Sequence, residues 1–218
     1  MSVQTTAAAL AAFVSLACTL VIAARLRMPG RRAPFVAWTI GFALFTVAEA
    51  TLWFGAYHGW TDRAFRLYYL TGAILVVPWL AVGELLLVWP GRRFTRLATA
   101  TMLWLSFAAA AAVLAADVDA GELASAGATP PNGAMGGPWT TILAIVCNSV
   151  GTVILLWGSL GSAWRRRDFR PALVAAGVLV IALASSATRL GGDVIFPAGQ
   201  ALGITLILLG VVLRPRPR

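Results

Sequence analysis

The chain has 218 residues, of which 60% are hydrophobic, and a positive mean hydropathy of +0.84. This composition excludes an ordinary soluble domain, because a globular fold of this length cannot bury so much apolar surface. The formal net charge of +9 comes from arginine alone, since the sequence has no lysine. In a membrane protein such charge is typical of cytoplasmic loops, so we expect the lipid bilayer as partner and no nucleic acid.

Seven apolar runs are long enough to cross a membrane as helices. They predict an all-α, polytopic membrane protein with a single domain, 1–218. The loop 117–137 is rich in Gly, Ala and Pro and has few large apolar residues, so we expect it to be mobile and dispensable for folding. The runs are approximately 3–25, 34–57, 66–89, 97–116, 139–163, 171–189 and 194–213.

The arginines predict the orientation of these helices. Fourteen of the 17 lie in the first, third and fifth loops and in the tail, whereas the other side has Arg63, Arg66 and Arg189. The excess of basic residues in cytoplasmic loops then places the N-terminus outside and the C-terminus inside, in a multi-pass protein of the cytoplasmic membrane. Trp60 and Trp139 are expected to anchor the outer interface. The fourteen are Arg25, Arg27, Arg31, Arg32, Arg92, Arg93, Arg96, Arg165, Arg166, Arg167, Arg170, Arg214, Arg216 and Arg218.

A faint internal repeat relates the two halves of the chain at an offset of 137 residues. It predicts half-repeats 3–90 and 139–213, with the helix 97–116 as a linker between them. Parallel repeats of this kind occur in transporters, whose sites lie near the midplane between the halves. The aligned identities are Pro34 with Pro171, Ala50 with Ala187, Thr51 with Thr188 and Gly55 with Gly192.

The third run, 66–89, has a charge near each end. Arg66 and Glu84 are separated by seventeen uncharged residues, roughly 27 Å along a helix, which is close to the roughly 30 Å of a bilayer's hydrocarbon core. Eighteen residues make about five helical turns, so both charges are predicted to lie on one face. Pro78 lies between them, and it removes the helical partner of the Ile74 carbonyl.

Glu49 is the most prominent candidate for function, because a carboxyl group inside a bilayer is costly and normally faces the protein interior. It lies roughly 12 Å inward of Tyr57 along the second helix. We expect it to contact Arg66 or Arg189. Two interpretations remain open, a purely structural ion pair and a ligand site. Glu49 continues a stripe at helical spacing, Trp38, Phe42, Phe45, Glu49 and Trp53.

The ligand interpretation places Glu49 in a neutral cluster of four charges at the outer mouth, with Arg66, Arg189 and Asp193. Tyr69 and Trp53 would form its aromatic wall. Such a cluster suits a zwitterionic or anionic small molecule or a lipid. The alternative is a structural network of ion pairs at the level of the lipid headgroups.

Four further positions inside the spans are candidates. Glu84 and Pro78 are candidates for proton binding or gating, the alternatives being a Glu that reaches the interface and a proline that is merely tolerated. Asn148 and Gln200 are intramembrane polar residues, which usually bond across helices. No set of His, Cys and carboxylates predicts a metal or cofactor, and no enzyme motif occurs, so catalysis is not expected.

The segments Phe65-Arg66-Leu-Tyr-Tyr-Leu-Thr-Gly-Ala and Val77-Pro78-Trp-Leu resemble a group of bacterial seven-helix membrane proteins, a resemblance that implies layout but no activity. Asp193-Val-Ile-Phe-Pro197 is similar to the seventh helix of microbial rhodopsins. There the retinal-binding Lys follows the Asp by four positions, and the resemblance therefore places Pro197 at the Lys position. Without any Lys, retinal is excluded as a cofactor. The three-plus-one-plus-three plan resembles SWEET-type sugar transporters.

Two functional hypotheses have the most support. The first is a small transporter or permease with a polar ligand site between helices in the outer half. The alternative is a membrane sensor that binds a ligand or lipid and acts on a cytoplasmic partner through the arginine-rich loops. A third hypothesis is an assembly subunit of a larger complex.

Overall fold

A computed structural model describes residues 3–27, 30, 32–127, 129–131, 133–187 and 195–213 of the chain. Over these residues the fold is helical, and the one β-bridge joins Val118 and Met135. The elements are α1 (Val3–Ala24), a 3-10 turn (Arg25–Arg27), α2 (Ala33–His58), α3 (Asp62–Tyr68), a π-helix η2 (Tyr69–Leu75), α4 (Val76–Val88), α5 (Arg92–Ala115), α6 (Ala120–Ser125), α7 (Pro138–Arg166), α8 (Arg170–Ala187) and α9 (Ile195–Val212).

Within the described residues, six helical segments are long and apolar enough to cross a bilayer. The all-helical fold class is therefore confirmed, and the six segments are compatible in length and composition with a multi-pass membrane protein. The predicted sixth run corresponds to α8, whose apolar stretch Arg170–Ser186 is shorter than the six. The six are Val3–Arg27, Ala33–His58, Asp62–Val88, Arg92–Ala115, Pro138–Arg165 and Ile195–Val212.

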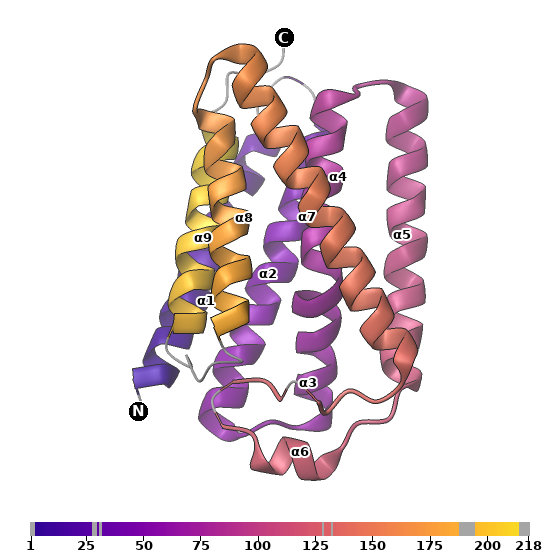
Figure 1. The fold of residues 1–218 in the computed structure, drawn as a ribbon, viewed down its shortest axis with the longest axis vertical. Coiled ribbons are helices and arrows are strands. Elements are labelled where there is room, and N and C mark those ends of the chain that lie inside the picture. Colours follow the sequence, from indigo (N-terminus) through magenta and orange to yellow (C-terminus); the bar gives the residue numbers. More distant parts are fainter. Residues whose placement is uncertain are drawn as a thin grey trace.

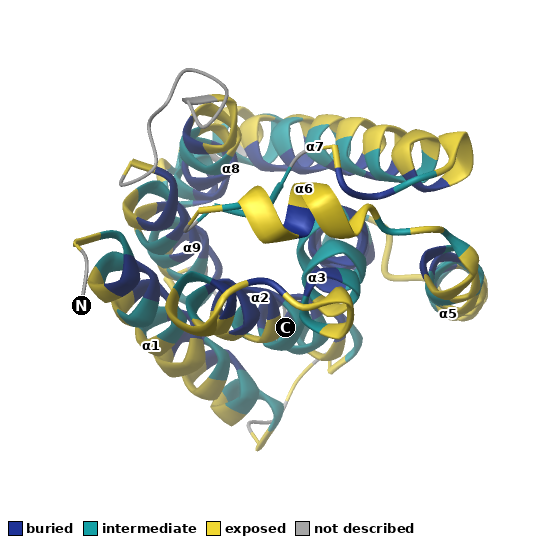
Figure 2. Cartoon of the chain, turned by 90° about the horizontal axis from the view of Figure 1, so that it is seen from below, coloured by how far each residue is buried: buried dark blue, intermediate teal, exposed yellow. Residues whose placement is uncertain are grey.

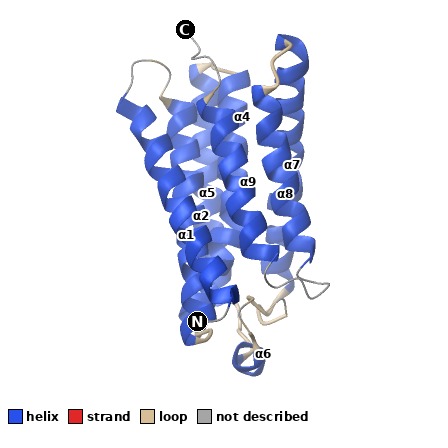
Figure 3. Cartoon of the chain, turned by 90° about the vertical axis from the view of Figure 1, so that its left-hand side faces the viewer, coloured by secondary structure: helices blue, strands red, loops and turns tan. Residues whose placement is uncertain are grey.

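Most of the long helices run roughly along one axis, whereas α7 crosses the bundle obliquely (Figure 1). Figure 3 shows the same bundle from the side. Around the bundle, α1 packs on α2, α2 on α4, α4 on α7, α7 on α8, α8 on α9, and α9 on α1, which closes a ring of six helices. Viewed from below, α5 stands outside this ring, beside α4 and α7 (Figure 2). We call the end where α2 finishes and α3 begins the lower end, as in Figure 1.

Glycines let the ring helices approach closely. A Cβ added to Gly177 of α8 would lie 2.5 Å from the carbonyl oxygen of Gly203 in α9, nearer than real Cβ atoms come. On the other side of the ring, a Cβ at Gly151 of α7 would meet Val77 at 2.8 Å, and one at Gly158 would meet Glu84 at 2.6 Å. Small residues at helix interfaces are the usual means of tight packing inside a membrane.

The described residues of the loop 117–137 pack as a cap on the bundle, which the sequence analysis did not predict. Its short helix α6 lies across the lower end of the ring (Figures 2 and 3). Leu123 and Met135 are buried and belong to the same apolar cluster as Leu52 and Phe65. The Asp119 amide donates to the Ala134 carbonyl at 2.9 Å, and the Asp119 side chain caps α6. The few apolar residues of the loop therefore close the bundle.

Candidate functional site

The predicted stripe of α2 faces the interior. Trp38, Phe42, Phe45 and Glu49 are all buried, and Glu49 is only 3% exposed. The inward direction of Glu49 is therefore confirmed. Trp53, one turn further down, is partly buried against the apolar cluster that contains Leu52 and Phe65, and its ring stacks on Tyr57 with centroids 6.2 Å apart.

The Glu49 carboxyl group lies where α2 meets the π-helix. A Cβ at Gly72 of η2 would come within 3.0 Å of the Ala48 Cβ, so the two backbones are close at this level. Tyr68, which begins the turn before Gly72, lies near enough to Glu49 for an electrostatic interaction. The Oε2 atom of Glu49 has no hydrogen-bond partner among the described residues. A buried oxygen of this kind has an acceptor site free for a ligand or a water molecule.

The predicted contact between Glu49 and Arg66 is wrong. Arg66 donates from Nε to both carboxylate oxygens of Asp62, at 2.9 and 3.0 Å. Its Nη1 donates to the carbonyls of Val113, at 2.5 Å, and Ala116, at 2.7 Å. These carbonyls end α5 and lack helical partners, so a cation there is well placed. Arg66 therefore ties α3 to α5, away from the ring interior.

Of the other members of the predicted charge cluster, Arg189 and Asp193 lie outside the described residues. Tyr69 is half-buried, packs on Phe65 with centroids 5.9 Å apart, and has its hydroxyl near Thr140 and Thr141 of α7. It therefore faces α7. Its neighbour Tyr68 occupies the place beside Glu49 that the sequence analysis gave to Tyr69.

Trp60 also belongs to this region, although we expected it to anchor the interface. It is buried over Gly55, where an added Cβ would come within 2.6 Å of the indole. Its ring meets those of Phe65 and Tyr68 at centroid distances of 6.1 and 5.6 Å. Trp139, the other expected anchor, is 72% exposed. Trp60 lies just beyond the end of α2, and no pattern in the sequence distinguished it from an interfacial residue.

Gln200 brings a polar group from the opposite side of the ring. It is buried on α9, and its Nε2 donates to Ser185 Oγ of α8 at 3.3 Å, so the predicted bond across helices is confirmed. Phe196, one turn before it, shares an apolar cluster with Leu52 and Trp60. Within the parts of the chain that are described, Gln200 Oε1 and the indole nitrogens of Trp53 and Trp60 are buried without hydrogen-bond partners.

The upper half of the ring contains the second carboxyl group. Glu84 is 1% exposed and lies against Gly158 of α7. The alternative that it reaches toward the interface is therefore wrong. Nearby, Trp38 Nε1 donates to the Leu80 carbonyl at 3.2 Å, and the Trp38 ring covers Gly83.

Pro78 lacks a backbone N–H in the third span, and the Asn148 side chain supplies a donor to a carbonyl near it. In the π-helix the Val76 amide donates to the Thr71 carbonyl, five residues earlier. In that register the donor to the Ala73 carbonyl would be residue 78, and proline has no N–H. Asn148 of α7 donates its Nδ2 to Ala73 O at 2.5 Å and to Ala144 O at 2.8 Å. The predicted role of Asn148 as a bond between helices is confirmed.

In the interior of the lower half of the ring, the described residues therefore place one buried carboxyl group, that of Glu49, and no buried cation, with aromatic rings near it and the α6 cap below it. In the same part of the chain, no group of three or more His, Cys, Asp and Glu side chains could hold a metal ion. Comparison with protein-family models, with curated proteins and with solved structures finds no match to this chain.

Proposed function

We propose that this protein is a small transporter, or permease, with a ligand site around Glu49 in the lower, outer half of the ring. The observation that carries the proposal is the buried Glu49 carboxyl group, whose Oε2 lacks a hydrogen-bond partner among the described residues. An ionisable side chain inside a membrane bundle is most often part of a substrate, ion or proton pathway.

The composition of the site favours a small organic cation as ligand. Glu49 offers an oxygen acceptor, and the rings of Trp53, Trp60 and Tyr68 belong to one apolar cluster at the same end of the ring. A carboxylate beside aromatic faces is a common way of holding an ammonium group. Arg66, which suggested an anionic or zwitterionic ligand, is bound to Asp62 and to the end of α5 instead.

The order of helices around the ring supports seven spans arranged as a parallel repeat. Helices opposite one another are α1 and α7, α2 and α8, and α4 and α9, given the order of packing around the ring. Each opposite pair runs in the same direction in Figure 1. These are the pairs expected if 3–90 and 139–213 are equivalent. The peripheral position of α5 fits a linker helix, and α8 then crosses the membrane as the partner of α2.

The arginines support the proposed orientation, with the N-terminus outside and the C-terminus in the cytoplasm. Among the described arginines, Arg63 and Arg66 lie in α3 at the lower end, while the others lie where helices begin or end at the upper end. Basic residues concentrate on the cytoplasmic side, so the upper end is the inner one.

A transporter also needs a segment that can change shape, and the third span offers one. The π-helix precedes Pro78, and π-turns and proline kinks are where the hydrogen-bond ladder of a helix is weakest. Glu49 and Tyr68 lie beside the beginning of this segment. A ligand bound there could bias its conformation.

Uptake into proteoliposomes tests the proposal. The probes are labelled choline and ethanolamine, with labelled glucose and glycerol 3-phosphate as neutral and anionic comparators. We expect saturable uptake of a cation that is abolished in Glu49→Gln and retained in Glu122→Gln. The second variant makes the same change at an exposed carboxyl group of α6.

The outcomes separate the functional classes. Uptake of the anion alone, or cation uptake that survives Glu49→Gln, would contradict the site. Saturable cation binding that depends on Glu49 but occurs without uptake would instead indicate the sensor.

A further inference from the structure

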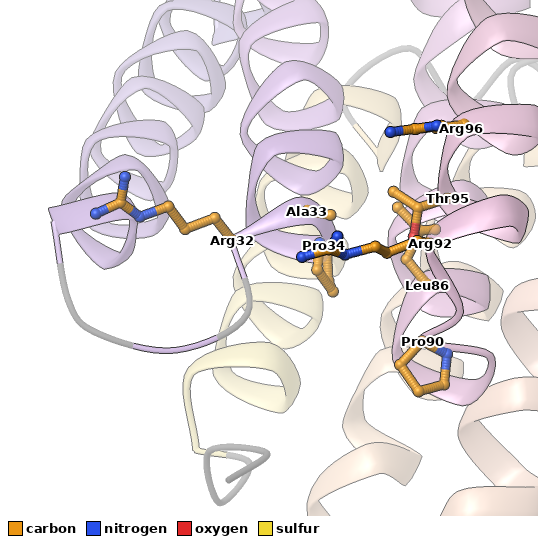
Figure 4. Close-up of a pocket in the computed structure, with 8 residues that line it drawn as sticks. All are labelled: Arg32, Ala33, Pro34, Leu86, Pro90, Arg92, Thr95 and Arg96. Atoms are coloured by element: carbon orange, nitrogen blue, oxygen red, sulfur yellow. The ribbon is translucent and has the colours of Figure 1, made fainter.

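A second site lies at the upper end of the molecule, far along the bundle from Glu49. A pocket of about 390 Å³ opens between the start of α2, the end of α4 and the start of α5 (Figure 4). Pro34 and Leu86 are buried and give it an apolar floor. The remaining lining residues are Arg32, Ala33, Pro90, Arg92, Thr95 and Arg96.

The pocket is strongly cationic. Arg92 and Arg96 project from α5 toward the start of α2, whereas the Arg32 side chain turns away from them at the rim (Figure 4). Among the described residues, no acidic side chain lines the pocket. The ion pairs among the described residues are Arg66–Asp62 and Arg170–Asp168. The three arginines of the pocket therefore have no acidic partner among those residues. Both α2 and α5 begin here, which adds positive potential from their helix dipoles.

The position of the pocket along the bundle suits a lipid headgroup. It lies where three membrane-length segments begin or end, at the level of Trp89, a residue type that prefers the membrane interface. Below it, the outward face of α5 exposes Leu97, Trp104 and Phe107, as expected of a lipid-facing helix. An occupant can therefore place a charged group among the arginines and acyl chains along α5.

We propose that this pocket binds the phosphate group of an anionic phospholipid, with Arg92 and Arg96 as its ligands and Thr95 as an additional donor. Guanidinium groups bind phosphate oxygens through paired hydrogen bonds. Basic pockets between membrane helices on the cytoplasmic side are suited to anionic headgroups. The site is independent of the proposed transport, because it shares no residue with the region around Glu49.

Native mass spectrometry of the purified full-length protein tests this site. The protein is titrated with phosphatidylglycerol, phosphatidylcholine, inorganic phosphate and the soluble headgroup glycerophosphoglycerol. We expect phosphatidylglycerol to bind most tightly. In the double variant Arg92→Gln/Arg96→Gln its affinity should fall about tenfold or more, because one charge-assisted hydrogen bond alone contributes about that factor and the variant removes both guanidinium groups.

The matched control is Arg165→Gln/Arg167→Gln, which removes the same charge from the same end of the molecule but outside the pocket. It should retain tight binding, and both double variants should keep the thermal midpoint of the wild type. Equal losses in the two variants, or equal affinity for phosphatidylglycerol and phosphatidylcholine, would overturn the site. Inorganic phosphate or glycerophosphoglycerol that binds as tightly as phosphatidylglycerol would overturn the assignment to a lipid.

Discussion

At the scale of single residues, Glu49 and Arg66 lead to opposite expectations for stability. Glu49→Gln replaces a buried carboxyl group that lacks an ion-pair partner among the described residues, so it should leave the thermal midpoint unchanged or raise it. Arg66→Gln removes the pair with Asp62 and the bonds that close α5, and it should destabilise the protein by about 2 kcal/mol.

Thermal unfolding of both variants in the same detergent measures the difference. A fall of several degrees in Glu49→Gln would mean that this carboxyl group holds a stabilising partner. A midpoint unchanged in Arg66→Gln would mean that the bonds to α5 contribute little.

The sequence predicted the direction of Glu49 because α2 is a regular helix, in which residues four apart share a face. It did not predict the direction of Arg66, because the third span is not regular. Each extra residue in a π-turn rotates the rest of the helix by about 100° relative to an unbroken α-helix. A regular helix would put Arg66 and Glu84 on one face. Because the π-helix lies between them, Arg66 is instead bound to α5 and Glu84 packs against α7.

At the scale of elements, the irregular third span depends on its neighbour α7. Asn148→Ala should destabilise the protein by about 1–2 kcal/mol, because it leaves the Ala73 carbonyl without its donor inside the membrane. In a Pro78→Ala background the same change should cost less, because residue 78 then has an N–H that can reach this carbonyl.

The double-mutant cycle is measured by thermal or denaturant unfolding in detergent. The expected result is a coupling energy of about 1 kcal/mol between the two positions, which lie on different helices. Strictly additive effects would show that Asn148 and Pro78 act on separate carbonyls. Thr152→Ala, on the same helix as Asn148, serves as a control and should show no coupling to Pro78.

The positions of the long helices could be predicted because runs of apolar residues of the required length admit few alternatives. The cap could not. Leu123 and Met135 are isolated among Gly, Ala and Pro, a composition typical of mobile loops. They are buried because the lower end of the ring presents an apolar surface that needs covering, and this surface exists only after helices distant in sequence have assembled.

At the scale of the whole molecule, the proposed internal repeat relates helices that lie on opposite sides of the ring. Equivalent helices of the proposed halves lie opposite one another across the ring, so Glu49 of α2 and Gln200 of α9 approach its interior from different halves. The sequence alone could not give this arrangement, because it depends on the order of packing around the ring. The same packing order leaves α5 outside the ring, where it lines the pocket that contains Arg92 and Arg96.

Whether α8 crosses the membrane decides between six and seven spans, and cysteine labelling can answer it. Cys18 and Cys147 are buried, so replacing both with alanine gives a background without reactive thiols. Phe169 precedes α8 at the upper end, Ser186 lies at its lower end, and both are exposed.

With seven spans, Ser186→Cys should react with a membrane-impermeant maleimide in intact cells, and Phe169→Cys should react only after permeabilisation. Arg93→Cys and Ser125→Cys give the inner and outer references. If Phe169→Cys and Ser186→Cys react from the same side, α8 does not cross the membrane, and both the seven-span plan and the parallel repeat fail.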